Sequence, residues 1–131
     1  MDHRRYNVNL SDWRLLMMLI AVGIDVSKGK STVAVLQPGC TVIKKPFDVL
    51  HSSSSLNDLS RFILRLEGET RVVVECTDRY YQSILQSLYN AGIFVSVVNP
   101  HLIKNFGNNT IRKVKSDTAD SRKIARYALD N

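Results

Sequence analysis

The sequence of 131 residues contains little cysteine, little proline and no long uninterrupted apolar run. Its 2 cysteines, Cys40 and Cys76, lie far apart and have no CxxC or histidine spacing, which argues against a disulfide framework and against a zinc site. The apolar run from Leu15 to Ile24 is too short to cross a bilayer, and it lacks the small-residue cleavage pattern of a signal peptide. A reducing compartment therefore fits this composition.

The overall composition is that of one ordinary globular domain. An apolar fraction of 44% and a charged fraction of 23% lie near globular averages and exclude collagen-like, wholly disordered and coiled-coil chains. A chain of this length can bury a single core without disulfides or metals. The 18 lysines and arginines exceed the 12 acidic residues, giving a net charge of +6, so an anionic partner is favoured and nucleic acid is the first candidate.

Residues 1–16 differ from the rest of the chain because they are polar and show no hydrophobic period. They precede Met17 and Met18, either of which could begin the protein. We therefore expect a poorly structured leader or tag over 1–16 and a single folded domain over 17–131.

The first half of this domain has the pattern of three antiparallel strands and a helix. Turn residues at Gly29 and at Pro38-Gly39 separate three β-prone segments, which span Leu19–Ser27, Ser31–Leu36 and Cys40–Phe47. Ser54 or Ser55 can cap the helix, and Gly68 ends it. The apolar face of this helix is formed by Leu56, Leu59, Ile63 and Leu66.

The second half alternates strands with helices. Three successive valines within 71–76 and the apolar run 93–98 are typical of strands buried on both faces, as in parallel sheets. The helix between them can be capped by Thr77 or Asp78 and ended by Gly92. Its inner face is formed by Tyr81, Ile84, Leu85 and Leu88.

A last helix is expected from Ser116 to about Leu129. The preceding strand–helix–strand unit implies a right-handed parallel crossover. Three antiparallel strands that lead into parallel α/β units predict an α/β fold with a mixed sheet of the ribonuclease H type, with a doubly wound sheet as the alternative.

Two acidic residues lie in or at the end of apolar strands. Asp25 sits between two apolar residues, where an ionised carboxylate is costly to bury without a cation, a metal or a set of donors. Glu75 ends the triple-valine strand, and the carboxyl ends of parallel strands are where open α/β sheets bind ligands. Each has a structural alternative: Asp25 can lie at an exposed strand end and accept turn amides, and Glu75 can interact with the N-terminus of the next helix.

Asp117 and Asp120 stand three residues apart at the start of the last helix. They share a face with Ile124 and Tyr127, the residues that this helix would bury, so the pair points at the body of the domain. Acids in a first turn are more often caps and dipole partners, and only the orientation favours a functional role.

The four carboxylates can converge if the strands of Asp25 and Glu75 are neighbours and the last helix packs across their ends. Such a cluster would repel itself without cations, and ligands that are all oxygen favour Mg²⁺ or Mn²⁺ over zinc. Two such ions about 3.5–4 Å apart are a known device for phosphoryl transfer. The predicted substrate is therefore a phosphodiester.

Basic residues precede and follow the aspartate pair. Those between 101 and 116 have no acid among them and are interleaved with asparagines that can contact phosphate oxygens, although a merely solvated loop would have the same composition. The predicted nucleic-acid contacts are Lys28, Lys104, Arg112, Lys113, Lys115 and Arg122.

Four strings of this sequence resemble, in order and spacing, the motifs of one family: Gly23-Ile24-Asp25-Val26-Ser27-Lys28, Glu75-Cys76-Thr77, Val97-Val98-Asn99-Pro100 and Lys115-Ser116-Asp117-Thr118-Ala119-Asp120-Ser121-Arg122. They are similar to the N-terminal domain of DEDD transposases of bacterial insertion sequences, the insertion-sequence one-ten family, which is related to pilin-gene invertases. The resemblance covers about Leu19 to Asn131, and four motifs in register are more specific than any one of them.

The resemblance implies a RuvC-like ribonuclease H fold in which Asp25, Glu75, Asp117 and Asp120 are the metal ligands. It also implies DNA recombination in the bacterial cytoplasm by a homo-oligomer that a structured bridge RNA guides. Family members need a second, C-terminal domain with a serine nucleophile. A chain that stops at Asn131 would then be an isolated domain, unable to complete strand exchange alone.

One position departs from the family pattern, which usually reads Glu-x-Thr-Gly-x-Tyr. Asp78 stands in the place of the glycine. Its side chain can crowd a close backbone approach to phosphate and adds a charge beside Glu75, or it serves as a helix N-cap. The change concerns the activity of the domain, not its fold.

Two other functions fit parts of the sequence. Gly23-Ile24-Asp25 before a hairpin also resembles the opening of actin-like and sugar-kinase-type nucleotide-binding domains, which need a glycine-rich hairpin where Lys28-Gly29-Lys30 supplies one glycine. The second alternative is a catalytically idle nucleic-acid-binding module in which the acids are caps.

Overall fold

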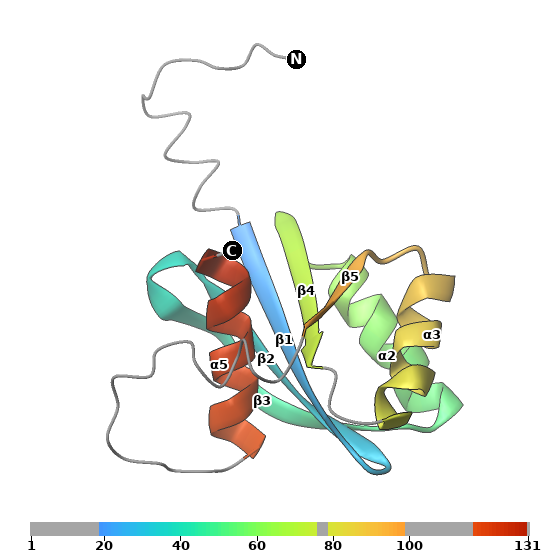
Figure 1. Cartoon of the computed structure of the whole chain (residues 1–131). Helices are drawn as coiled ribbons and strands as arrows, with labels where there is room; N and C mark the ends of the chain where they lie inside the picture. Colours follow the sequence, from blue (N-terminus) through green and yellow to red (C-terminus); the bar gives the residue numbers. More distant parts are fainter. Residues whose placement is uncertain (1–18, 76–78, 99–116, 131) are drawn as a thin grey trace.

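The computed structural model describes residues 19–75, 79–98 and 117–130. Five strands form one mixed sheet in the order β3-β2-β1-β4-β5. β1 pairs antiparallel with β2 and parallel with β4, β2 pairs antiparallel with β3, and β4 pairs parallel with β5 (Figure 1). The strands are β1 (Leu19–Ser27), β2 (Lys30–Gln37), β3 (Thr41–Leu50), β4 (Glu69–Glu75) and β5 (Val95–Val98). The predicted mixed sheet is confirmed.

Glycines shape both hairpin turns, as the sequence predicted. Gly29 and Gly39 have φ of 81° and 82°, a conformation that side chains with a Cβ rarely adopt. β3 runs to Leu50, beyond the predicted end at Phe47. The strand continues because Phe47 and Val49, two residues apart, both face the same core, so the alternation of inward and outward side chains extends beyond Phe47.

Helix α2 (Ser53–Leu64) begins and ends earlier than expected. Its N-cap is Ser52, whose Oγ accepts a hydrogen bond of 3.3 Å from the backbone N–H of Ser55, so the predicted caps Ser54 and Ser55 are wrong. Any serine in this run has cap chemistry, and the point where β3 leaves the sheet selects the first suitable one. Arg65 is the C-cap, and the chain leaves the helix before Gly68.

Helix α3 (Gln82–Asn90) follows the short 3₁₀ helix Arg79–Tyr81, and the predicted caps Thr77 and Asp78 lie outside the described residues. Its other end is as predicted. Gly92, at φ 82°, donates its N–H to the Tyr89 carbonyl at 2.9 Å, and Ile93 donates to the Leu88 carbonyl at 3.0 Å. These two bonds are the Schellman motif, which satisfies carbonyls left open at a helix end.

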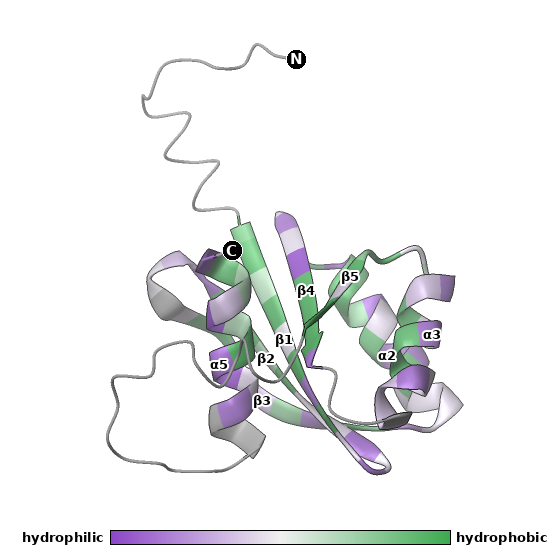
Figure 2. Cartoon of the chain, in the orientation of Figure 1, coloured by the Kyte–Doolittle hydropathy of each residue, from purple (hydrophilic) through white to green (hydrophobic). Residues whose placement is uncertain are grey.

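The sheet is covered on both faces, and strand alternation sorts the residues between them. Ile24 and Val74 join the core beneath α2 and α3, whereas Ala21 and Val73 join the core beneath α5 (Asp117–Asp130). Figures 1 and 2 show α5 on one side of the sheet and α2 with α3 on the other, with hydrophobic colouring along β1. None of the described helices has the length and hydrophobicity that a membrane-spanning helix requires.

Gly23 is the point where α5 lies against β1. A Cβ on Gly23 would stand 2.2 Å from the backbone nitrogen of Ala125 and 2.6 Å from the backbone oxygen of Ser121. These are rigid backbone atoms and cannot move aside as a side chain can. Only glycine therefore permits this distance between helix and strand.

We expect Gly23→Ala to lower the free energy of unfolding by about 3 kcal/mol, because overpacking against backbone falls at the upper end of the usual range. Gly29→Ala is the control, since nothing lies within 4 Å of its Cβ position and only its positive φ opposes a side chain, at about 1 kcal/mol. Urea unfolding measures both. Equal losses in the two variants would contradict the close approach.

His51 connects the end of β3 to the turn between β1 and β2. Its backbone N–H donates to the Gly29 carbonyl at 3.0 Å, and its Nε2 lies 2.8 Å from Oγ of the buried Ser31. Burial lowers the pKa of His51 below its ordinary value, because desolvation disfavours the charged imidazole. Protonation of His51 therefore opposes folding.

This histidine should contribute stability above its ordinary pKa of 6.5, and that contribution should disappear as the pH falls toward the lower pKa of the folded state. His51→Gln cannot gain a proton, so its stability should decline less on acidification. Urea unfolding at pH of about 7.5 and about 5.5 gives the comparison. An identical decline in both proteins would exclude His51 as the cause.

Candidate functional site

Asp25 is a buried carboxylate near the carboxyl end of β1. It is 8% exposed and pairs across the sheet with Thr32 of β2. The alternative in which Asp25 occupies an exposed strand end is therefore wrong. Alternation places Asp25 on the same side of β1 as Ala21 and Gly23, which is the face that α5 covers.

Glu75 is the last residue of β4, the strand that lies parallel to β1 and next to it. The pairing of the two strands runs as far as Ile24 with Val74, and one further residue brings Glu75 beside Asp25. Glu75 is partly buried and, by alternation from Val73, lies on the α5 face. The two strand carboxylates thus occupy the same end and the same face of adjacent strands.

Helix α5 runs opposite to β1 and β4. Nη1 of Arg71, near the start of β4, donates to the Ala128 carbonyl at 3.3 Å, and Gly23, further along β1, lies against Ser121 and Ala125. Two residues of a strand span about 6.6 Å, which is the length of about four helix residues. Because the helix runs in the opposite direction, moving two residues forward along β1 corresponds to moving about four residues back along α5.

The first turn of α5 therefore lies toward the strand ends that carry Asp25 and Glu75. Asp117 begins this turn, and Asp120 is partly buried within it. Ile124 is fully buried and Tyr127 packs on the same core, as predicted for the face that the two aspartates share.

The described residues do not show the four carboxylates gathered into one cluster. Within the described part of the chain, where the side chain of Asp117 is not included, no three His, Cys, Asp or Glu residues gather closely enough to hold a metal ion. Their role as ligands therefore stays a prediction.

Asp48 of β3 is a further polar residue in the row that crosses the sheet through Asp25, and the sequence analysis did not identify it. Thr32 pairs with Asp25 on one side and with Asp48 of β3 on the other. The hydroxyl of Thr32 donates to Asp48 Oδ1 at 3.0 Å, and Lys30 Nζ donates to Asp48 Oδ2 at 3.4 Å. The position of Asp48 between the inward-facing Phe47 and Val49 was the available signal, because alternation turns it to the opposite face.

The predicted nucleic-acid contacts are only partly described. Lys28 is exposed in the turn after β1, and Arg122 is exposed on α5 one residue after the buried Ser121. Both are therefore accessible to a polyanion. The remaining four lie outside the described residues: Lys104, Arg112, Lys113 and Lys115.

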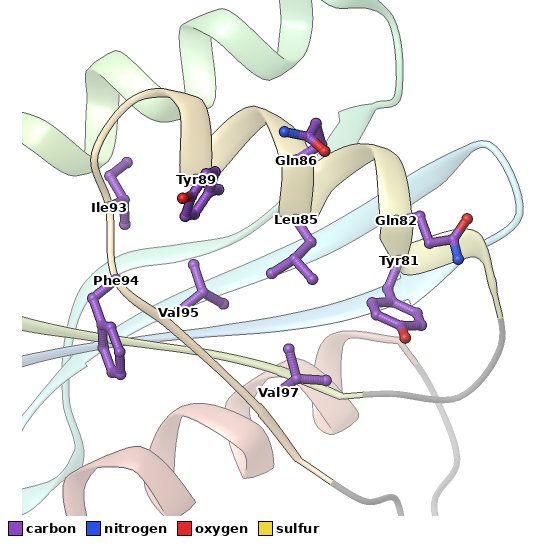
Figure 3. Close-up of a pocket in the computed structure, with 9 residues that line it drawn as sticks. All are labelled: Tyr81, Gln82, Leu85, Gln86, Tyr89, Ile93, Phe94, Val95 and Val97. Atoms are coloured by element: carbon purple, nitrogen blue, oxygen red, sulfur yellow. The ribbon is translucent and has the colours of Figure 1, made fainter.

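An apolar pocket lies elsewhere, between α3 and β5. Its volume is about 690 Å³, and none of the described residues that line it is charged (Figure 3). Val95 and Val97 line it from the sheet face opposite to Val98, so it lies away from Asp25 and Glu75. Leu85, predicted to pack inward, also lines this pocket. The pocket is therefore not part of the carboxylate site.

Comparisons with known proteins bear on the family and the fold of this chain. A family model described as a transposase, that of the IS110 DEDD type, matches residues 22–131. The fold is similar to that of RuvC from Thermus thermophilus in two structures, one of them in complex with a Holliday junction substrate. Both matches have a TM-score of 0.58 and 15% sequence identity. The match to the complex covers 82% of this chain and the other covers 81%, and each covers 90% of the RuvC chain. No curated protein sequence matches the chain.

A ROK family transcriptional regulator, a homologue of the E. coli MLC protein, is similar at a TM-score of 0.51 and 14% identity, over 70% of this chain and 31% of that chain. At such identities these likenesses show the fold alone. The likeness to RuvC confirms the predicted RuvC-like ribonuclease H fold.

Proposed function

Since the chain belongs to the IS110 family of DEDD transposases, we propose that its domain binds divalent cations through Asp25, Glu75, Asp117 and Asp120 and acts on DNA phosphodiesters during transposition. The arrangement of β1, β4 and α5 supports this proposal most. Two of the carboxylates occupy neighbouring strand ends on one face, and the helix that carries the other two begins toward that end.

The donor set fits Mg²⁺ or Mn²⁺. All four groups are carboxylates, the hard oxygen ligands that these cations prefer. Asp25 is buried, and a buried carboxylate is costly unless positive charge or donors compensate it. When bound, such cations stabilise charge on the attacking and leaving oxygens of a phosphodiester. The chain itself contributes a rigid support, with two ligands on paired strands and two on a helix packed against Gly23.

The basic residues would hold the DNA backbone beside the carboxylates. Lys28 follows the strand of Asp25, and Arg122 follows Asp120 on α5, so both lie close in sequence to proposed ligands. Lysine and arginine contacts to phosphate position a nucleic acid without reading its sequence. We assign the same role to Lys104, Arg112, Lys113 and Lys115.

The resemblance extends the proposal to the whole protein. We infer a domain over 17–131 preceded by a leader over 1–16, a structured guide RNA, a homo-oligomer in the bacterial cytoplasm, and a separate serine-bearing domain that completes strand exchange. Asp78, in place of the usual glycine, is the feature that favours the competing function, an idle nucleic-acid-binding module. Nucleotide binding is disfavoured, because the turn between β1 and β2 supplies a single glycine.

Manganese should stabilise the wild-type domain against unfolding, by about 2.7 kcal/mol when free Mn²⁺ is a hundredfold above Kd. Asp25→Ala should remove this gain, because it deletes a central ligand. Thermal unfolding with and without Mn²⁺ measures the difference, and Asp58→Ala, an exposed carboxylate of α2, is the matched control. No gain in the wild type would support the idle module, and an undiminished gain in Asp25→Ala would exclude Asp25 as a ligand.

Arg122→Ala should weaken DNA binding and reduce the slope of log affinity against log salt by about 0.9, the value for one lost phosphate contact. Fluorescence anisotropy with duplex DNA at several salt concentrations measures the slope. Arg61→Ala on α2, across the sheet from α5, removes the same charge and should leave the slope unchanged. A slope unaltered by Arg122→Ala would argue against a phosphate contact.

A further inference from the structure

Thr32 separates two carboxylates on the face of the sheet that α5 covers. Asp25 of β1 is its direct partner on one side, and Asp48 of β3 is its direct partner on the other. Side chains in such cross-strand positions have Cβ atoms about 4.5–5.5 Å apart. The hydroxyl of Thr32 can therefore reach either carboxylate.

The hydroxyl of Thr32 can donate a single hydrogen bond, and in the structure its acceptor is Asp48. Its Oγ1 donates to Asp48 Oδ1 at 3.0 Å, while Lys30 Nζ donates to Asp48 Oδ2 at 3.4 Å. Thr32 is almost fully buried, and a buried hydroxyl without a partner is costly. If Asp48 were absent, the other carboxylate in a direct cross-strand position, Asp25, could accept a hydrogen bond from this hydroxyl.

The direction of that alternative bond matters. β2 and β4 flank β1 on opposite sides, so Thr32 and Glu75 lie on opposite sides of Asp25. A hydrogen bond from Thr32 would draw the Asp25 carboxylate toward β2, away from Glu75, and would occupy an oxygen lone pair. A cation shared by Asp25 and Glu75 would then lose part of its coordination.

We propose that Asp48 is a positioning residue for the cation site. It accepts the hydrogen bond of the Thr32 hydroxyl, while Lys30 holds the other oxygen of its carboxylate. The Asp25 carboxylate is thereby kept directed toward Glu75. The inference rests on the proposed function of Asp25 as a metal ligand. It does not require Asp48 to touch the cation. Removal of a partner that orients a ligand typically weakens metal binding 10- to 100-fold.

Calorimetric titration of the domain with Mn²⁺ tests this. Asp48→Ala should weaken Mn²⁺ binding about tenfold, whereas Asp48→Asn should retain most of the affinity because its amide oxygen still accepts from Thr32. The decisive comparison is made in a Thr32→Val background, where no hydroxyl proton exists. There, Asp48→Ala should change the affinity less than twofold.

The control is Asp58→Ala, which removes another exposed carboxylate paired to a basic side chain. The Asp58 and Asp48 side chains are 73% and 56% exposed, so both variants should fold, and only Asp48→Ala should affect Mn²⁺. If Ala and Asn at position 48 weaken binding equally, and do so with or without the Thr32 hydroxyl, Asp48 acts by charge and the inference is overturned. Unchanged affinity in Asp48→Ala overturns it as well. Absence of Mn²⁺ binding in the wild type would instead overturn the proposed function, and this inference with it.

Discussion

The contact between the backbones of β1 and α5 at Gly23 determines where the functional groups lie. No side chain separates the helix from the strand there, and Ser121 and Ala125 provide the small surface that packs on it. The Arg71 bond to the Ala128 carbonyl fixes the same helix further along. Two contacts at different levels set both the distance and the direction of α5, so its first turn extends toward the ends of β1 and β4.

The same arrangement explains why a carboxylate is tolerated within the sheet. Asp25 follows Ile24 and precedes Val26, which both belong to the core beneath α2 and α3, yet alternation turns Asp25 to the other face. There the row that crosses the sheet is polar, with Asp48 and Thr32 on one side and Glu75 on the other. This polar row interrupts the apolar layer on the face of α5.

Much of this could be predicted from the sequence, because local patterns encode it. The three valines of β4 are buried on alternating faces, Gly92 ends α3 with the expected hydrogen bonds, and both hairpin turns use glycine at positive φ. The N-cap of α2 could not be predicted, since four consecutive serines have equal chemistry and tertiary structure selects among them.

The role of Asp48 could not be predicted either, because its bond to Thr32 depends on the register between β2 and β3. Register is a property of two strands together, and it involves an irregularity between Val33 and Leu36 that no single-strand pattern encodes. For the same reason, the adjacency of Asp25 and Glu75 became apparent only when the strand order was known.

A crystal of the domain grown with Mn²⁺ and measured for anomalous scattering gives the most direct test of the central claim, that acidic residues of two strands and a helix hold a divalent cation. The account predicts an anomalous peak bonded to carboxylate oxygens of Asp25 and Glu75, with an aspartate from the first turn of α5 completing the protein ligands. Fully occupied Mn²⁺ bound elsewhere, with these carboxylates turned away from one another, would contradict it.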